Sequence, residues 1–151
     1  MAGYSGTPLP KKLGIKPGHR IAVIGAPKNA MATIAEIAAA GPVQLKFTGS
    51  QPYDVIVAFC DSQRTFASRF DSAKARLVEN GGLWVAWPKQ SSGVETDLNE
   101  NIIRMIGLAS GLVDNKVCAI DQTWSGLRFV VRVAARKSSP RRTRGTENKG
   151  K

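Results

Sequence analysis

The chain has 151 residues, enough for one domain, and a domain near this size buries roughly 68–70% of the surface that its unfolded chain exposes. Hydrophobic residues make up 42% of the chain and charged residues 22%, as in globular proteins, and no run approaches the ~20 apolar residues of a membrane-spanning helix. The net charge is +11, and the N-terminus lacks the features of a secretory signal or a transit peptide, so we expect a cytoplasmic protein.

The first part of the chain predicts an extension followed by a strand-turn-helix unit. Residues 1–19 are rich in Gly and Pro and contain a short apolar segment over 9–15. We expect this extension to pack on the domain edge. Residues 20–25 form a continuous apolar run that ends in glycine, which is typical of a buried parallel strand. Apolar residues at helical spacing then predict a helix over 29–40, which a Gly-Pro pair ends.

The middle of the chain predicts two further strands and a helix. A weak strand over 43–47 precedes the clearest strand, over 52–59. Ser62 can cap a helix that runs to about Glu79, and the Asn-Gly-Gly that follows favours a left-handed C-terminal cap. The next strand covers 82–88.

The last part of the folded region predicts a helix and an antiparallel hairpin. A polar loop over 89–96 leads to a helix that Asp97 and Glu100 begin as a capping-box pair. Residues 112–121 and 127–134 alternate well enough for two strands with a short connector. We therefore predict a Rossmann-like α/β domain over 20–135. Its sheet is mostly parallel with helices on both faces, and its methyltransferase-like topology is trimmed by about one helical unit.

The end of the chain predicts a disordered basic tail over 136–151. This segment holds seven Lys or Arg against one acid, Glu147, and therefore carries just over half of the net charge. It is too poor in apolar side chains to offset the entropy cost of ordering. Such a tail can bind nucleic acid weakly and without sequence preference, whereas the folded part shows no recognition-helix pattern.

The cysteines and the histidine argue against a metal site. Cys60 and Cys118 each lie in an apolar, strand-like run, and we expect small buried hydrophobes there, with a disulfide or a reactive thiol as the alternative. His19 is the only histidine, so the sequence contains no His/Cys cluster with zinc spacing.

Several strings match a known family in order and spacing. The most recognisable are YSGTPL, WPKQSSGVETDL, GLVDNKVCAID and TWSGLRFVVR. Through them the stretch from Met1 to about Val133 resembles the bacterial domain-of-unknown-function family 3052. GIKPGHRIAVIG and ARLVENGGLWVAWP are also similar to passages of methyltransferase-like proteins. The resemblance implies a small Rossmann-like fold and assigns no activity.

The predicted sheet has one edge where a ligand would bind. In open α/β sheets the loops at the carboxyl ends of the strands gather along one rim, and ligands usually bind there. On the strand assignment above, this rim collects four loops, 25–29, 60–63, 88–97 and 121–126.

The first of these loops argues against S-adenosylmethionine and NAD. Gly25 is present, but Pro27 stands at the place of a second glycine, where it adds bulk and removes an N–H donor. The second strand ends in Lys46-Phe47-Thr48, without the carboxylate that would bind ribose hydroxyls. The canonical fingerprint of either cofactor is therefore absent, and no complete catalytic motif replaces it. Lys28 could attract an anion or could be an ordinary surface lysine.

The two later loops hold the candidate binding residues. The loop over 88–97 offers an ammonium group, hydroxyls and a glycine that can direct its N–H toward a ligand, and these groups suit a phosphate or a carboxylate. The acidic residues at the start of the helix that follows would, however, repel an anion. Trp124 is either a lid over the rim or a plug packed on the sheet. The predicted ligand-binding residues are Lys89, Ser91, Ser92, Asp97, Asp121, Thr123, Trp124 and Ser125.

The sequence is compatible with three alternative functions. The leading one is binding of a small anionic or flat ligand at the rim. If Trp87 and Trp124 converge with Lys89, they form an aromatic and basic pocket for this ligand. Trp84 and Trp87 are three residues apart in the same predicted strand, so their side chains point to opposite faces of the sheet. The alternatives are a degenerate methyltransferase-like interaction module without catalysis and a nucleic-acid accessory acting through the tail. A Ser-Lys nucleophile would need a shaped site that spacing alone does not provide.

Overall fold

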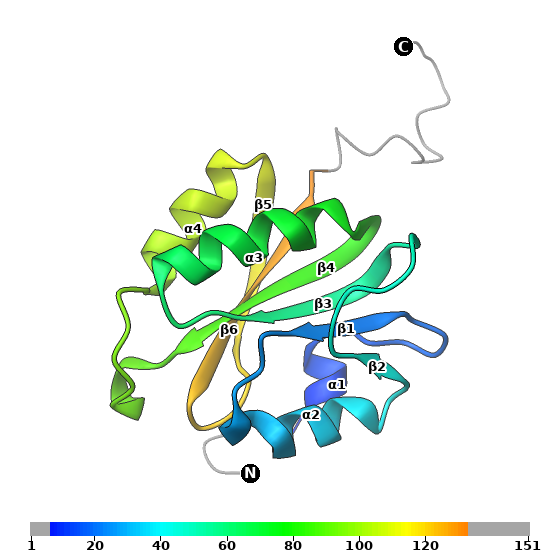
Figure 1. Cartoon of the computed structure of the whole chain (residues 1–151), viewed down its shortest axis with the longest axis horizontal. Coiled ribbons are helices and arrows are strands. Elements are labelled where there is room, and N and C mark those ends of the chain that lie inside the picture. The colour runs from blue at the N-terminus through cyan, green and yellow to red at the C-terminus, as the bar shows by residue number, and fades with distance from the viewer. Residues whose placement is uncertain (1–6, 133–151) are drawn as a thin grey trace.

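A computed structural model of the chain describes residues 7–132 and contains one six-stranded sheet there (Figure 1). The strand order is β2-β1-β3-β4-β6-β5. In chain order the strands are β1 (Ile21–Ile24), β2 (Val43–Gln44), β3 (Tyr53–Phe59), β4 (Leu77–Pro88), β5 (Leu112–Ala119) and β6 (Trp124–Val131). The first four strands pair in parallel, and β6 runs antiparallel to both β4 and β5. The expected fold class is therefore confirmed, including the C-terminal antiparallel hairpin.

Helices cover both faces of this sheet. Along the chain they are α1 (Leu9–Lys12), η1 (Lys28–Ala30), α2 (Met31–Ala38), α3 (Gln63–Ala75), η2 (Gln90–Ser92) and α4 (Glu100–Ala109). Figure 1 shows α3 and α4 on one face of the sheet, and α1 and α2 on the other. Within residues 7–132 none of the helices has the length and apolar character needed to cross a bilayer.

Each face of the sheet carries its own hydrophobic cluster. The first cluster contains Phe66 and Phe70 of α3, Ile103 of α4 and Phe129 of β6. Leu13, Ile37 and Trp84 are fully buried members of the second. Trp84 and Trp87 belong to different clusters, which confirms that they point to opposite faces of β4.

The segment before the first strand lies across the second face. The indole Nε1 of Trp84 donates a hydrogen bond to the carbonyl of Leu13 at 3.1 Å. The Lys12 ammonium donates to the carbonyl of Ala119 in β5 at 2.8 Å, and Lys116 of the same strand donates back to the Lys12 carbonyl at 3.0 Å. The apolar segment over 9–15 thus contributes to the core, since Leu9 and Leu13 are both buried.

The boundary between α3 and β4 differs from the expectation. The helix ends at Ala75 instead of running to Glu79, and the strand begins at Leu77, which pairs with Tyr53. Gly81 and Gly82 therefore lie inside a strand, and neither adopts a positive φ. A Cβ on Gly81 would lie 2.6 Å from the carbonyl oxygen of Asp54, so this glycine allows close strand packing and does not cap a helix.

The capping-box prediction at the start of α4 is also wrong. Asn99 caps this helix, its side chain accepting a hydrogen bond from the backbone N–H of Ile102 at 2.9 Å. The Asp97 carboxylate instead accepts from the backbone N–H of Gln63 at the start of α3, at 2.7 Å. The acid therefore links the loop after β4 to a helix that is distant in sequence.

Other expected boundaries shift by a few residues. The helix expected over 29–40 is divided between η1 and α2, and β2 is shorter than the expected 43–47. The last strand begins at Trp124, inside the predicted connector. The predicted basic tail lies outside the described residues.

Candidate functional site

Two pockets open along the carboxyl-end rim. The larger has a volume of about 930 Å³ and the smaller about 420 Å³. The larger is lined by the segment from Trp87 to Asn101, except Ser91 and Ser92, together with Ser125. The smaller lies over the ends of β1 and β3 and is lined by Gly25, Pro27, Asn29, Phe59, Asp61, Thr65, Arg69, Val94 and Trp124. Val94 lines both pockets, so the loop after β4 divides the rim into two compartments.

The two loops that were expected to be neighbours lie side by side. The backbone N–H of Lys89 donates to the carbonyl of Thr123 at 2.8 Å. Trp87 pairs with Ser125, and Pro88 pairs with Trp124, across the antiparallel ladder of β4 and β6. Both loops therefore open at the same edge of the sheet.

The predicted binding residues are divided among four locations. Lys89, Asp97 and Ser125 line the larger pocket, whereas Trp124 lines the smaller. Ser91 and Ser92 lie on η2 and line neither pocket, and Asp121 and Thr123 lie in the turn of the hairpin. Their roles as ligand contacts stay predictions.

Two of these residues have structural partners that the sequence did not reveal. The Asp121 carboxylate accepts hydrogen bonds from the backbone N–H groups of Thr123 and Trp124, both at 2.8 Å, and from the Thr33 hydroxyl at 2.5 Å. It therefore fixes the hairpin turn and ties it to α2. The Ser92 hydroxyl donates to the carbonyl of Lys89 at 2.6 Å, which shapes the η2 turn.

Trp87 and Trp124 do not converge, so the condition for a shared aromatic and basic pocket is not met. Adjacent pairs of an antiparallel ladder project from opposite faces, and Trp87 and Trp124 belong to adjacent pairs. Trp124 instead packs edge-on against Phe59, with the ring centroids 5.0 Å apart. It is only 4% exposed, so it is a packed plug and not a lid.

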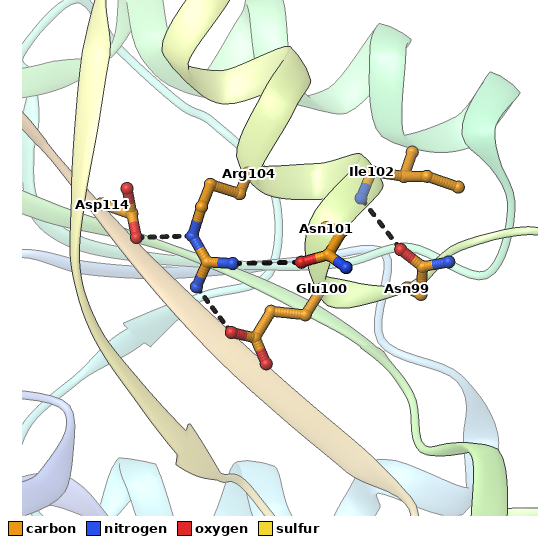
Figure 2. A network of polar contacts seen from close by, with 6 residues as sticks. All are labelled: Asn99, Glu100, Asn101, Ile102, Arg104 and Asp114. Carbon is orange, nitrogen blue, oxygen red and sulfur yellow. Dashed lines mark hydrogen bonds and ion pairs between the residues drawn. The ribbon is translucent and has the colours of Figure 1, made fainter.

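Arg104 binds Glu100 and Asn101, two residues that line the larger pocket, and Figure 2 shows these polar contacts. Its guanidinium donates to Asp114 of β5 at 2.9 Å and to Glu100 at 2.5 Å, and it reaches Asn101 at 3.5 Å. The hydrogen bonds that Arg104 donates to Asp114 first, and then to Glu100, raise the pKa of the guanidinium above its ordinary value. These groups are partly exposed, so the ion pairs stabilise the fold only modestly. Their consequence is positional, because they hold Glu100 and Asn101 at the pocket.

The charge of the larger pocket is mixed. Lys89 supplies the ammonium group, and the carboxylates come from Glu95, Asp97 and Glu100. Asp97 is engaged by the N-terminus of α3, and Glu100 is paired with Arg104. Lys89, Glu95 and Asp97 form no ion pair among the described residues, although Asp97 accepts the backbone hydrogen bond from α3.

Arg69 is the functional candidate that the sequence reasoning missed. Its guanidinium donates a hydrogen bond from Nη1 to the carbonyl of Phe59 and lies against Gly25. Gly25 has φ +72, and a Cβ there would overlap the guanidinium, so the glycine makes room for the arginine. Thr65 and Arg69 are four residues apart on α3, the helix that follows β3, so their side chains lie on the same face of the helix. This spacing is the sequence signal that would have placed both side chains at the carboxyl-end rim.

The order of strands and the antiparallel β6 define a methyltransferase-like Rossmann fold. Similar solved structures include a TehB-like SAM-dependent methyltransferase from Corynebacterium glutamicum, with a TM-score of 0.55 and 10% identity over 87% of this chain and 91% of that chain. The ribosomal protein L11 methylase from Lactobacillus delbrueckii subsp. bulgaricus gives a TM-score of 0.53 and 12% identity, covering 82% and 75% of the two chains.

A SAM-dependent methyltransferase from Aquifex aeolicus gives a TM-score of 0.50 and 14% identity, over 81% of this chain and 87% of that chain. At these identities the likeness establishes the fold alone. No protein-family model and no curated protein matches the sequence.

The rim residues do not fit the S-adenosylmethionine that these neighbours' names imply. Pro27 precedes η1 and offers no N–H, and the guanidinium of Arg69 fills the space beside Gly25 that such a ligand's approach requires. From Val43 to Pro52 the chain contains no carboxylate that could bind ribose hydroxyls. Within residues 7–132 no three His, Cys, Asp or Glu side chains are grouped to hold a metal ion.

The two thiols differ in burial. Cys60 follows β3 and is 1% exposed, and burial raises the pKa of its thiol to about 12. Cys118 of β5 is half-buried, and burial raises the pKa of its thiol as well. Both are free, and the burial of Cys60 agrees with the expectation of a small buried hydrophobe, whereas Cys118 is only partly buried.

Cys60 is expected to resist alkylation in the folded protein. The thiolate is the reactive form, so at pH 8 a thiol reagent should modify Cys60 at least ~100-fold more slowly in the native state than in urea. The rates can be followed by mass spectrometry in a Cys118→Ser variant, which leaves Cys60 as the only thiol. Equal rates in the two states would show that the thiol is accessible.

Proposed function

We propose that this protein is a small-ligand-binding Rossmann-like domain whose ligand occupies the larger pocket on the carboxyl-end rim. One observation carries the proposal, namely a pocket of about 930 Å³ at the edge where open α/β sheets bind ligands. Its volume lies in the range of small-molecule sites, which is roughly 300–1,000 Å³. We also propose, from the sequence strings alone, that the chain is a bacterial member of domain-of-unknown-function family 3052.

The lining supports a ligand with a flat apolar part and a single anionic group. Trp87, Pro88 and Leu98 provide apolar surface, and the Lys89 ammonium can pair with a carboxylate or a phosphate. Because Glu95 carries an unneutralised charge in the same pocket, a second anionic group would be repelled.

The experiment is an inventory of small molecules that copurify with the protein, followed by thermal-shift titration with aromatic carboxylates and nucleotides. A true ligand at 100 times its Kd should stabilise the fold by about 2.7 kcal/mol. Lys89→Gln should weaken binding at least ~10-fold because it removes the charge that pairs with the anion. Lys46→Gln is the matched control, since this exposed lysine lies outside the lining of both pockets.

Two results would count against the proposal. One is that no compound copurifies or shifts the melting temperature. The other is that Lys89→Gln and Lys46→Gln leave binding equally unchanged. In either case the alternative of an interaction module without ligand chemistry would be favoured. It is supported by the exposed apolar side chains of α4, where Met105 is 64% exposed and Ile106 and Leu108 exceed a third. The nucleic-acid alternative rests on residues 136–151, outside the described part of the chain.

A further inference from the structure

We infer that the smaller rim pocket is a second binding site, for a small zwitterion such as a free α-amino acid. It lies at the point of the sheet where the chain leaves β1 toward β2 on one side and returns as β3 on the other. Such a switch point is the usual ligand crevice of an open α/β sheet. The site is separate from the larger pocket, so the inference does not depend on the function proposed above.

The pocket contains one cation and one anion that do not pair with each other. Among the described residues, the Arg69 guanidinium donates a hydrogen bond to the Phe59 carbonyl, and no carboxylate lies within ion-pair distance of it. Its remaining N–H donors are available to a ligand. Asp61 lines the same pocket, where its carboxylate accepts a weak hydrogen bond of 3.4 Å from the Thr65 hydroxyl.

An α-amino acid matches this arrangement of charges. Its carboxylate can form the forked pair with a guanidinium that arginine favours, and its ammonium can bind an aspartate. A simple anion would meet the unneutralised charge of Asp61, and a simple cation that of Arg69. The two charges of the pocket together therefore favour a ligand that carries both.

The rest of the wall is suited to the side chain of such a ligand. Phe59, Val94 and Trp124 supply apolar surface, and the cavity of about 420 Å³ is adequate for a small molecule.

The test is calorimetric titration of the full chain with each of the common amino acids, and with the amide and the N-acetyl derivative of any that binds. Saturable binding is expected for at least one amino acid. Each derivative should bind at least ~10-fold more weakly, because each lacks one of the two charges. These measurements use the unaltered protein and do not depend on how a variant folds.

Charge-removing variants provide the second arm. Arg69→Gln and Asp61→Asn should each weaken binding at least ~10-fold. Their matched controls, Arg64→Gln and Asp71→Asn, remove exposed charges of α3 outside the pocket and should leave affinity unchanged. Lys89→Gln should also have no effect, which separates this site from the larger one.

Three results would overturn the inference. The first is the absence of binding by any amino acid at millimolar concentration. The second is that the N-acetyl derivative or inorganic phosphate binds as well as the parent amino acid, which would indicate a plain anion site. The third is that S-adenosylmethionine binds more tightly than the amino acids, which would indicate a cofactor site.

Discussion

Replacement of Trp84 by alanine is expected to lower the free energy of unfolding by about 3–5 kcal/mol. The side chain is fully buried in the central strand of the sheet, and its Nε1 is bonded to the Leu13 carbonyl. The substitution removes one of the two tryptophan side chains of the second cluster and leaves that carbonyl without its donor. Urea denaturation monitored by far-UV circular dichroism measures the change.

Two further variants separate packing from hydrogen bonding at this position. Trp84→Phe keeps most of the volume but loses the donor, so its cost should be smaller, about 1–3 kcal/mol. Leu45→Ala is the surface control, because Leu45 is 59% exposed and its truncation should change stability by less than ~0.5 kcal/mol. If Trp84→Ala cost no more than Leu45→Ala, the packing described for the second face would be incorrect.

Gly107→Ala is expected to destabilise the protein although it replaces a glycine within a helix. Alanine would by itself favour the helix by about 1 kcal/mol. A Cβ at this position, however, would overlap the Phe129 ring of β6, and overpacking typically costs about 1–3 kcal/mol. Gly107→Val should cost more than Gly107→Ala because it adds bulk at the same contact. Urea titrations of both variants test the order.

A double-mutant cycle with Phe129→Leu identifies the source of the effect. The smaller side chain makes room for the added methyl group, so the two substitutions should cost less together than the sum of their separate effects. Strict additivity would show that the helix and the strand are not in contact at this point.

The sequence specifies the order of elements better than their ends. Continuous apolar runs and glycine stops correctly predicted β1, β3 and the hairpin, since burial on both faces leaves a clear pattern in the sequence. The end of α3 was misplaced because glycine favours both helix caps and close strand packing. Gly81 serves the second purpose, facing the backbone of Asp54. Only the tertiary neighbour distinguishes these cases.

The candidate site was predicted in part for a related reason. Strand order brings the loops after β4 and β5 to one edge, and this follows from topology alone. The faces toward which Trp87 and Trp124 point depend on the register of the hairpin, and the register was not predictable from composition. Arg69 was missed because a helical arginine is ordinarily a solvated surface residue, and its contact with Gly25 joins distant segments.

The bonds between α1 and β5 have a consequence for the rate of folding. Lys12 and its partner Ala119 are separated by 107 positions. A contact of such high sequence separation closes a long loop, and this loop closure costs entropy before the contact stabilises the fold. Docking of α1 onto β5 is therefore expected to follow the pairing of strands that are closer in the sequence.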